Sequence, residues 1–135
     1  MPHTFSWEPH VATVRFEGFV SGEEFLAGAR ALGADPRFDD LRYVVNDFTA
    51  ITGHAIDAPE LMEDLGAISI GSRATNPQLR VLIVTTDERI RRLAAGMSSP
   101  PYDDSHAKHV FEAPADLHGW LRGALLQRDP AFRGS

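Results

Sequence analysis

The feature that most constrains the fold of this chain is the uninterrupted apolar run Val81-Leu82-Ile83-Val84. A strand with one face in water alternates apolar and polar residues, whereas a continuous β-branched run is typical of a strand covered on both faces. The next residues, Thr85-Thr86-Asp87, can cap a helix, and we expect one over residues 87–97 with Thr85 or Thr86 as its cap. A buried strand followed at once by a helix indicates an α/β fold.

The first part of the chain predicts a hairpin and then a helix. Residues 4–7 form a short segment before Pro9, and residues 11–16 alternate apolar and polar side chains before Glu17-Gly18. Ser21, with Glu24 one helical turn later, forms a capping box, which predicts a helix over residues 22–32. Gly33 provides the C-terminal stop of that helix.

The middle of the chain predicts a second strand and helix. Residues 41–45 are apolar and rich in β-branched and aromatic side chains, which indicates an interior strand. Residues 48–56 are expected to form a loop-like crossover. A helix should follow from Asp57, which can cap it, with Pro59 in its first turn.

The C-terminal part completes the pattern with a short strand at Val110-Phe111 and a helix over residues 114–126, whose Trp120 is expected in the core. The predicted order is ββαβαβαβα, an α/β fold with a mixed, mostly parallel sheet and one antiparallel edge from the hairpin. Residues 1–127 are expected to form one domain, and residues 128–135 a frayed tail.

The composition narrows the functional classes. The 135 residues include no cysteine, which excludes disulfides and thiolate chemistry and fits a reducing compartment such as the cytoplasm. Nineteen acidic residues against thirteen basic ones give a formal net charge of −6, so a phosphate backbone is repelled and nucleic acid is not an expected partner. No apolar stretch is long enough to insert across a membrane, and no signal peptide is expected.

Five short segments follow one another in an informative order: VATVRFEG, SGEEFLAGARAL, LRYVVNDFTAITG, RVLIVTTDERIRRLA and HVFEAPADLHGWL. In this order they resemble the SpoIIAA-like proteins of the STAS clan, over about residues 11–122. The resemblance implies a sandwich like that of the anti-sigma-factor antagonists, in which a mixed sheet is packed by helices. It also implies a regulatory domain that works through protein partners.

The resemblance implies a phosphorylation site that this chain lacks. In the antagonists, the strand equivalent to residues 41–47 leads to an Asp-Ser step at a helix N-terminus, where a partner kinase phosphorylates the serine. The corresponding residues 52–58, TGHAIDA, contain no serine. Asp57 stands there as an ordinary helix cap or as a fixed charge that mimics the phosphate, and Thr49 and Thr52 are the remaining hydroxyl groups.

The loops at the carboxyl ends of parallel strands meet at one edge of the sheet, and this edge is the candidate site. We expect it to carry a ligand or partner surface formed by Asn46, Asp47, Thr49, His54, Asp57, Thr85, Thr86 and Arg89. The alternatives are a turn-forming carboxylate for Asp47 and an exposed loop histidine for His54. No catalytic residue is assigned, because the sequence lacks a nucleophile turn of the type G-x-S-x-G.

Asp103, Asp104, His106 and His109 form a cluster of metal-ligating residue types within seven positions. The segment lacks the HExxH frame that places two imidazoles on one helix face, so a solvated loop is expected there. No metal and no cofactor are predicted.

Three functional hypotheses follow from the sequence. The first is a non-enzymatic regulatory or protein-interaction domain that binds a protein partner or self-associates through the loop after Asp47. The second is a carrier for a small lipid-like, apolar or anionic ligand, suggested by the clan's likeness to lipid-carrier folds and by the small residues along residues 66–71. The third is an enzyme that uses Asp47 and His54. A pocket at the site favours a ligand, and a flat apolar surface favours a partner.

Overall fold

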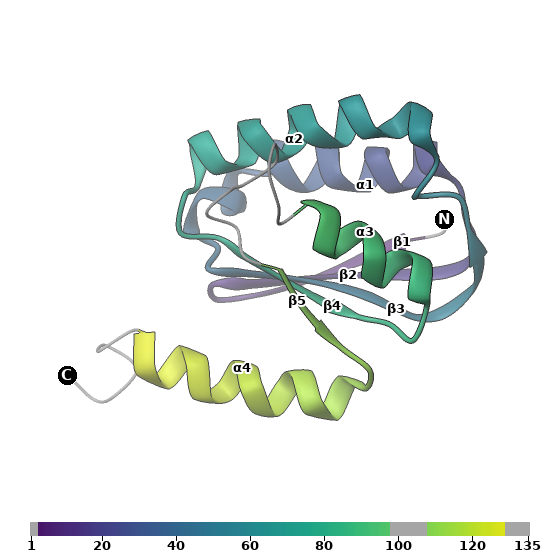
Figure 1. Cartoon of the computed structure of the whole chain (residues 1–135). Helices are drawn as coiled ribbons and strands as arrows, with labels where there is room; N and C mark the ends of the chain where they lie inside the picture. The colour runs from purple at the N-terminus through teal and green to yellow at the C-terminus, as the bar shows by residue number, and fades with distance from the viewer. Residues whose placement is uncertain (1–2, 98–107, 129–135) are drawn as a thin grey trace.

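The chain forms a five-stranded sheet with helices on both faces (Figure 1). The structure, a computed structural model, describes residues 3–97 and 108–128. The strands are β1 (His3–Glu8), β2 (Val11–Val20), β3 (Tyr43–His54), β4 (Arg80–Val84) and β5 (Lys108–Phe111). The α-helices are α1 (Gly22–Ala34), α2 (Met62–Thr75), α3 (Glu88–Met97) and α4 (Pro114–Arg128), and the short 3-10 helices are η1 (Pro36–Asp40) and η2 (Pro59–Leu61).

The sheet has the spatial order β1-β2-β3-β4-β5, in which β1 is antiparallel to β2 and every later pair is parallel. Figure 1 shows α1, α2 and α3 on one face of the sheet and α4 on the other. This arrangement covers both sides of β4, as its continuous apolar run predicted. The predicted element order and the mixed, mostly parallel sheet are confirmed.

The local signals at the start of the chain are confirmed in part. The Ser21 hydroxyl accepts the N–H of Glu24 at 3.2 Å and so caps α1. The helix then runs past the predicted stop to Ala34 and ends at Asp35, because Gly33 does not take a left-handed conformation. In the turn between β1 and β2, His10 takes a left-handed φ of 69°. The carbonyl of His10 accepts the N–H of Tyr43 at the start of β3.

β3 is longer than predicted, and this changes the candidate site. The loop-like crossover over residues 48–56 is wrong, because β3 continues to His54 beside the second half of β2. Two register shifts keep this pairing, and at each of them β3 has one residue more than β2. Gly18 takes a φ of 66° next to the second shift, which lets β2 continue past the glycine where it was predicted to end.

The predicted cap of α3 is also wrong. The Asp87 carboxylate accepts the N–H groups of Arg89 and Ile90 at 2.9 and 3.0 Å, so Asp87 is the cap. Thr85 is buried and its hydroxyl accepts the N–H of Asp87, while Thr86 is exposed. Helix α3 begins one residue later than predicted. The carboxylate of Asp87, a stronger acceptor than a threonine hydroxyl, takes the capping position.

The core has one layer on each face of the sheet. Phe16 and Phe48 stack with ring centroids 4.9 Å apart on the face covered by α1, α2 and α3. Tyr43 and Leu117 are fully buried on the α4 face, and burying each such side chain contributes about 1.5–3 kcal/mol. Trp120 was expected in the core but is 37% exposed, so it covers the rim of this layer. No helix in the described ranges is long and apolar enough to span a bilayer.

Candidate functional site

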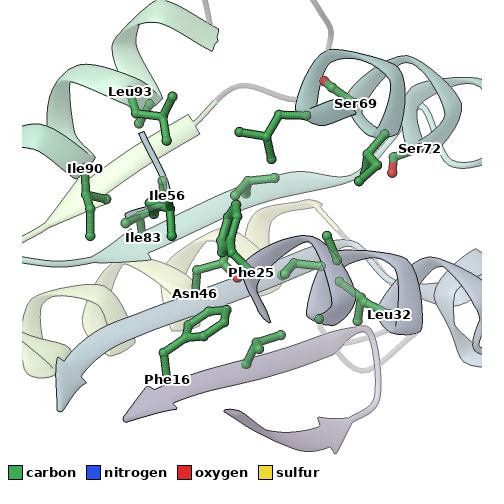
Figure 2. A pocket seen from close by; sticks show the side chains of 18 of the residues that line it. Phe16, Phe25, Leu32, Asn46, Ile56, Ser69, Ser72, Ile83, Ile90 and Leu93 are labelled. Carbon is green, nitrogen blue, oxygen red and sulfur yellow. The ribbon is translucent and has the colours of Figure 1, made fainter. Parts of the chain in front are cut away.

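A cavity of about 170 Å³ lies between the sheet and the helices α1, α2 and α3. Figure 2 shows its lining, with Phe16, Asn46 and Ile83 on the strands. Ser69 on α2 and Leu93 on α3 lie on the helical side. Segments far apart in the sequence therefore line one apolar space.

The cavity is lined at several points by small side chains. Ala29 on α1 and Ser69 and Ser72 on α2 lie in the lining, where larger side chains would fill space, and Gly28 contributes backbone to it. Within its described residues, α2 buries only Leu65 and Gly66. Because protein interiors are packed about as densely as organic crystals, a hollow of this size is unusual in so small a domain.

The lining is almost entirely hydrocarbon. No charged side chain lines the cavity in the part of the chain that the structure describes. The polar side chains are Asn46 on the strand side and Ser69 and Ser72 on the helical side. Such a space suits a neutral apolar molecule with few polar groups.

His54 and Asp87 form the centre of a second feature, at the carboxyl ends of β3 and β4. The His54 side chain is only 1% exposed. Its Nδ1 accepts the N–H of Ile56 at 3.2 Å, so its Nε2 carries the proton and donates to Oδ1 of Asp87 at 3.1 Å. The exposed-loop alternative for His54 is wrong, because the histidine is buried at the end of a strand.

Asp57 and Arg89 form a two-bonded ion pair next to this histidine. Arg89 donates from Nε and Nη2 to the two carboxylate oxygens of Asp57 at 2.8 and 2.6 Å. Its guanidinium lowers the pKa of Asp57 to about 2, and the carboxylate raises the pKa of Arg89. The predicted capping role of Asp57 is wrong, because η2 and α2 begin without a side-chain cap.

His54, Asp57, Asp87 and Arg89 together form what we call the polar cluster. The cluster holds the backbone at two points of the cavity wall, since His54 accepts the N–H of Ile56 and Asp87 accepts the N–H of Ile90. The side chains of both isoleucines line the cavity (Figure 2). The polar cluster thus fixes one end of the apolar space.

Six of the eight predicted site residues fall into three groups in the structure, while Thr85 and Thr86 lie in the turn before α3. His54, Asp57 and Arg89 meet in the polar cluster, and Asn46 lines the cavity. Asp47 is next to Asn46 on β3 and points to the opposite face, because successive strand residues alternate. Its carboxylate accepts the N–H and the hydroxyl of Thr49 at 2.9 and 2.6 Å at the first register shift of β3.

The arrangement does not supply the Asp47 and His54 pair that the enzyme hypothesis requires. His54 is hydrogen-bonded to Asp87 and not to Asp47. The Asp47 carboxylate accepts the N–H of Thr49 within its own strand. Both ring nitrogens of His54 are engaged within the fold, which leaves no lone pair to take a proton from a substrate.

Most of the predicted metal-type cluster lies outside the described residues, which is the case for Asp103, Asp104 and His106. His109 is described, and its ring lies 4.9 Å from that of Trp120, between centroids. Residues 3–97 and 108–128 contain no group of three or more side chains that could hold a metal ion.

Sequence reasoning missed Asp87 and most of the cavity lining. Asp87 follows two threonines after a buried strand, and a carboxylate at that step is itself a capping signal. The cavity has no comparable signal, except that the small-residue stretch over residues 66–71 contributes Ser69 to its wall.

A five-stranded mixed sheet in this order, with one helix layer on each face, defines the SpoIIAA-like fold. The solved structure of the anti-sigma factor antagonist SpoIIAA in its unphosphorylated form has a TM-score of 0.58 and 11% identity, over 90% of this chain and 98% of that chain. An uncharacterised DUF3478 protein with a SpoIIAA-like fold from Shewanella loihica has a TM-score of 0.52 and 14% identity, over 88% of this chain and 91% of that chain. These likenesses establish the fold. No protein-family model matches the sequence, and no curated protein matches it.

Proposed function

We propose that this domain binds a small apolar ligand in the cavity between the sheet and the helices α1, α2 and α3, without chemistry of its own. The observation that supports the proposal is a space of about 170 Å³ with a hydrocarbon lining. An engineered apolar cavity of about 150 Å³ stays dry and binds benzene. A space of this size therefore accepts a ligand built on roughly one ring.

The apolar lining also restricts the charge of the ligand in the carrier hypothesis. A charged ligand loses its hydration on entering an apolar space and needs a partner charge there. The described lining contains no such charge, so we propose a neutral ligand in place of an anionic one.

The test is a ligand titration followed by thermal unfolding, with toluene as the probe. A ligand that binds only the folded state raises stability by RT ln(1 + [L]/Kd), about 2.7 kcal/mol at one hundred times Kd. We expect toluene to raise the melting temperature of the wild type. Native mass spectrometry of freshly purified protein will show whether a ligand is retained from the cell.

The matched variants are Ala29→Leu and Ala27→Leu, both on α1. Ala29 lines the cavity, whereas Ala27 is exposed on the other side of the helix. Filling the cavity stabilises the protein and removes the ligand's space, so Ala29→Leu should be insensitive to toluene and Ala27→Leu should respond like the wild type. A wild type that ignores toluene, or two variants with equal responses, would contradict the proposal.

A second candidate is a regulatory domain that works through a protein partner or through self-association. It is supported by the fold shared with SpoIIAA and by Phe19, which is 59% exposed at the end of β2 and packs over Gly53. Gly53 precedes His54, so Phe19 lies beside the predicted surface. An exposed aromatic ring of this kind is common at interfaces.

Sedimentation equilibrium of the purified chain tests self-association. If the surface around Phe19 self-associates, Phe19→Ala should weaken the dimer at least about tenfold, because aromatic anchors dominate interface energies. Ile70→Ala is the control, since Ile70 is 60% exposed on α2. A monomer at every concentration leaves self-association unsupported and removes this form of the candidate.

A further inference from the structure

Asn46 is a polar side chain set in a hydrocarbon wall. On β3 it lies between Val44 and Phe48, which also line the cavity. Its register partners on the neighbouring strands, Val14 on β2 and Ile83 on β4, line the cavity as well. The amide is therefore surrounded by apolar side chains within the sheet, and Figure 2 shows it among them.

The Asn46 side chain makes no hydrogen bond with any residue in the described ranges of the chain. Asn76 provides the contrast, because its amide donates to the carbonyls of Phe38 and Leu41 at 2.9 and 2.8 Å. The Asn46 side chain is half-buried and lines the cavity. Its amide therefore has donor and acceptor groups that a molecule in the cavity can bond.

The two serines in the lining lie on a helix, whereas Asn46 lies on a strand. Ser69 and Ser72 lie on α2, and a helical serine can bond the carbonyl one turn before it. A strand offers its amide side chain no such local acceptor, because the strand's own N–H and C=O groups are used in the ladder. Asn46 is thus the polar group on the sheet side of the described wall, and its amide is available to a molecule in the cavity.

Resting on the proposed function, we infer that the ligand is a neutral molecule of about one ring that carries a single hydroxyl, carbonyl or N–H group, and that Asn46 binds this group. An amide offers both an acceptor oxygen and two donor hydrogens, so it can pair with any of the three. The rest of the ligand contacts hydrocarbon. Asn46 is accordingly the residue that distinguishes the ligand from a plain hydrocarbon of the same shape.

Phenol and toluene test this inference, because they have nearly the same shape and differ in a hydroxyl against a methyl group. A buried site built to hydrogen-bond a hydroxyl rejects the analogue that lacks it, since its own polar group is left unpaired. We expect the wild type to bind phenol about tenfold or more tightly than toluene by calorimetric titration.

The variant is Asn46→Val, which suits a strand and makes the wall fully apolar. It should reverse the preference, so that toluene binds more tightly than phenol. Thr13→Val removes a hydroxyl from β2 next to the cavity-lining Val14, on the opposite face of the sheet, and is the control, which should keep the wild-type ratio. Circular dichroism of each variant checks that the fold is kept.

The outcomes separate this inference from the proposed function. If both compounds bind and Asn46→Val leaves their ratio unchanged, the cavity binds ligands but Asn46 does not select them, and the inference is overturned. If neither compound binds the wild type or Asn46→Val, the proposed function fails and this inference fails with it. If Asn46→Val prefers toluene while the wild type and the control prefer phenol, the result supports both the proposed function and the role of Asn46.

Discussion

His54, the last residue of β3, donates its Nε2–H to Oδ1 of Asp87 across 3.1 Å and so joins the sheet to the N-terminus of α3. The same oxygen accepts the N–H groups of Arg89 and Ile90. Burial by itself raises the pKa of Asp87, but the Ile90 N–H and the His54 ring together hold it below its usual range. One carboxylate thus caps a helix and satisfies a buried ring.

Asp87→Ala should therefore destabilise the protein by about 2 kcal/mol, because it removes a helix cap and leaves the buried ring N–H of His54 without an acceptor. Urea unfolding measures the change. Thr86→Ala is the control, since Thr86 is the exposed neighbour, and its effect should stay within about 0.5 kcal/mol. Equal unfolding midpoints for the two variants would show that the cluster does not hold α3.

Asn76 joins the end of α2 to the segment before β3. It is 3% exposed, and its amide donates to the carbonyls of Phe38 and Leu41. Asn76→Ala should cost about 2 kcal/mol, because two buried carbonyls lose their donor. Gln78→Ala, at an exposed position two residues on, is the control and should be close to neutral. The free energies of unfolding of the two variants, measured at the same pH, test the prediction. Equal values for Asn76→Ala and Gln78→Ala would contradict it.

The elements of the fold were predictable because their signals are local. The Val81 to Val84 run and the Ser21 cap depend on residues close in sequence, and both appear in the structure as predicted. The length of β3 was not predictable in this way. Its extension depends on pairing with the second half of β2, which two register shifts permit and no local pattern encodes.

The candidate site was predictable only as a neighbourhood. His54, Asp57 and Arg89 do meet at the predicted edge, because parallel strands bring their carboxyl ends together. Their roles depend on pairs more than thirty residues apart in sequence, such as Asp57 with Arg89 at a separation of 32. The cavity is the space that small side chains leave between the sheet and the helices. A hydrophobicity pattern does not predict such a space.

Two glycines in α1 should respond differently to alanine. A Cβ at Gly22 would overlap the side chain of Leu61, while a Cβ at Gly33 would meet nothing within 4 Å. Alanine in a helix gains about 0.5–1 kcal/mol over glycine through backbone entropy. Gly33→Ala should therefore stabilise the protein by that amount, and Gly22→Ala should gain less or destabilise it. Thermal unfolding measures both, and a larger gain at position 22 would show that Leu61 does not restrict it.

The Asp57 and Arg89 pair gives the protein a specific dependence on acid. The pKa of Asp57 is lowered from 3.8 to about 2 in the folded state, chiefly by the hydrogen bonds from Arg89. A lowered folded-state pKa stabilises the protein above the unfolded value, and that stabilisation is lost as the pH falls toward the folded value. The window of loss therefore lies between about pH 5 and about pH 2.

Asp57→Asn should accordingly have a lower free energy of unfolding than the wild type at about pH 7. This difference should be smaller at about pH 2, where the wild type has lost most of the stabilisation from the ion pair. The Asp57 and Arg89 side chains are 28% and 51% exposed, so solvent screening limits the expected difference to about 1 kcal/mol. Urea unfolding at both pH values measures it, with Asp64→Asn on the exposed face of α2 as the control. A difference between Asp57→Asn and wild type that is the same at both pH values would mean that the ion pair contributes nothing that depends on its charge.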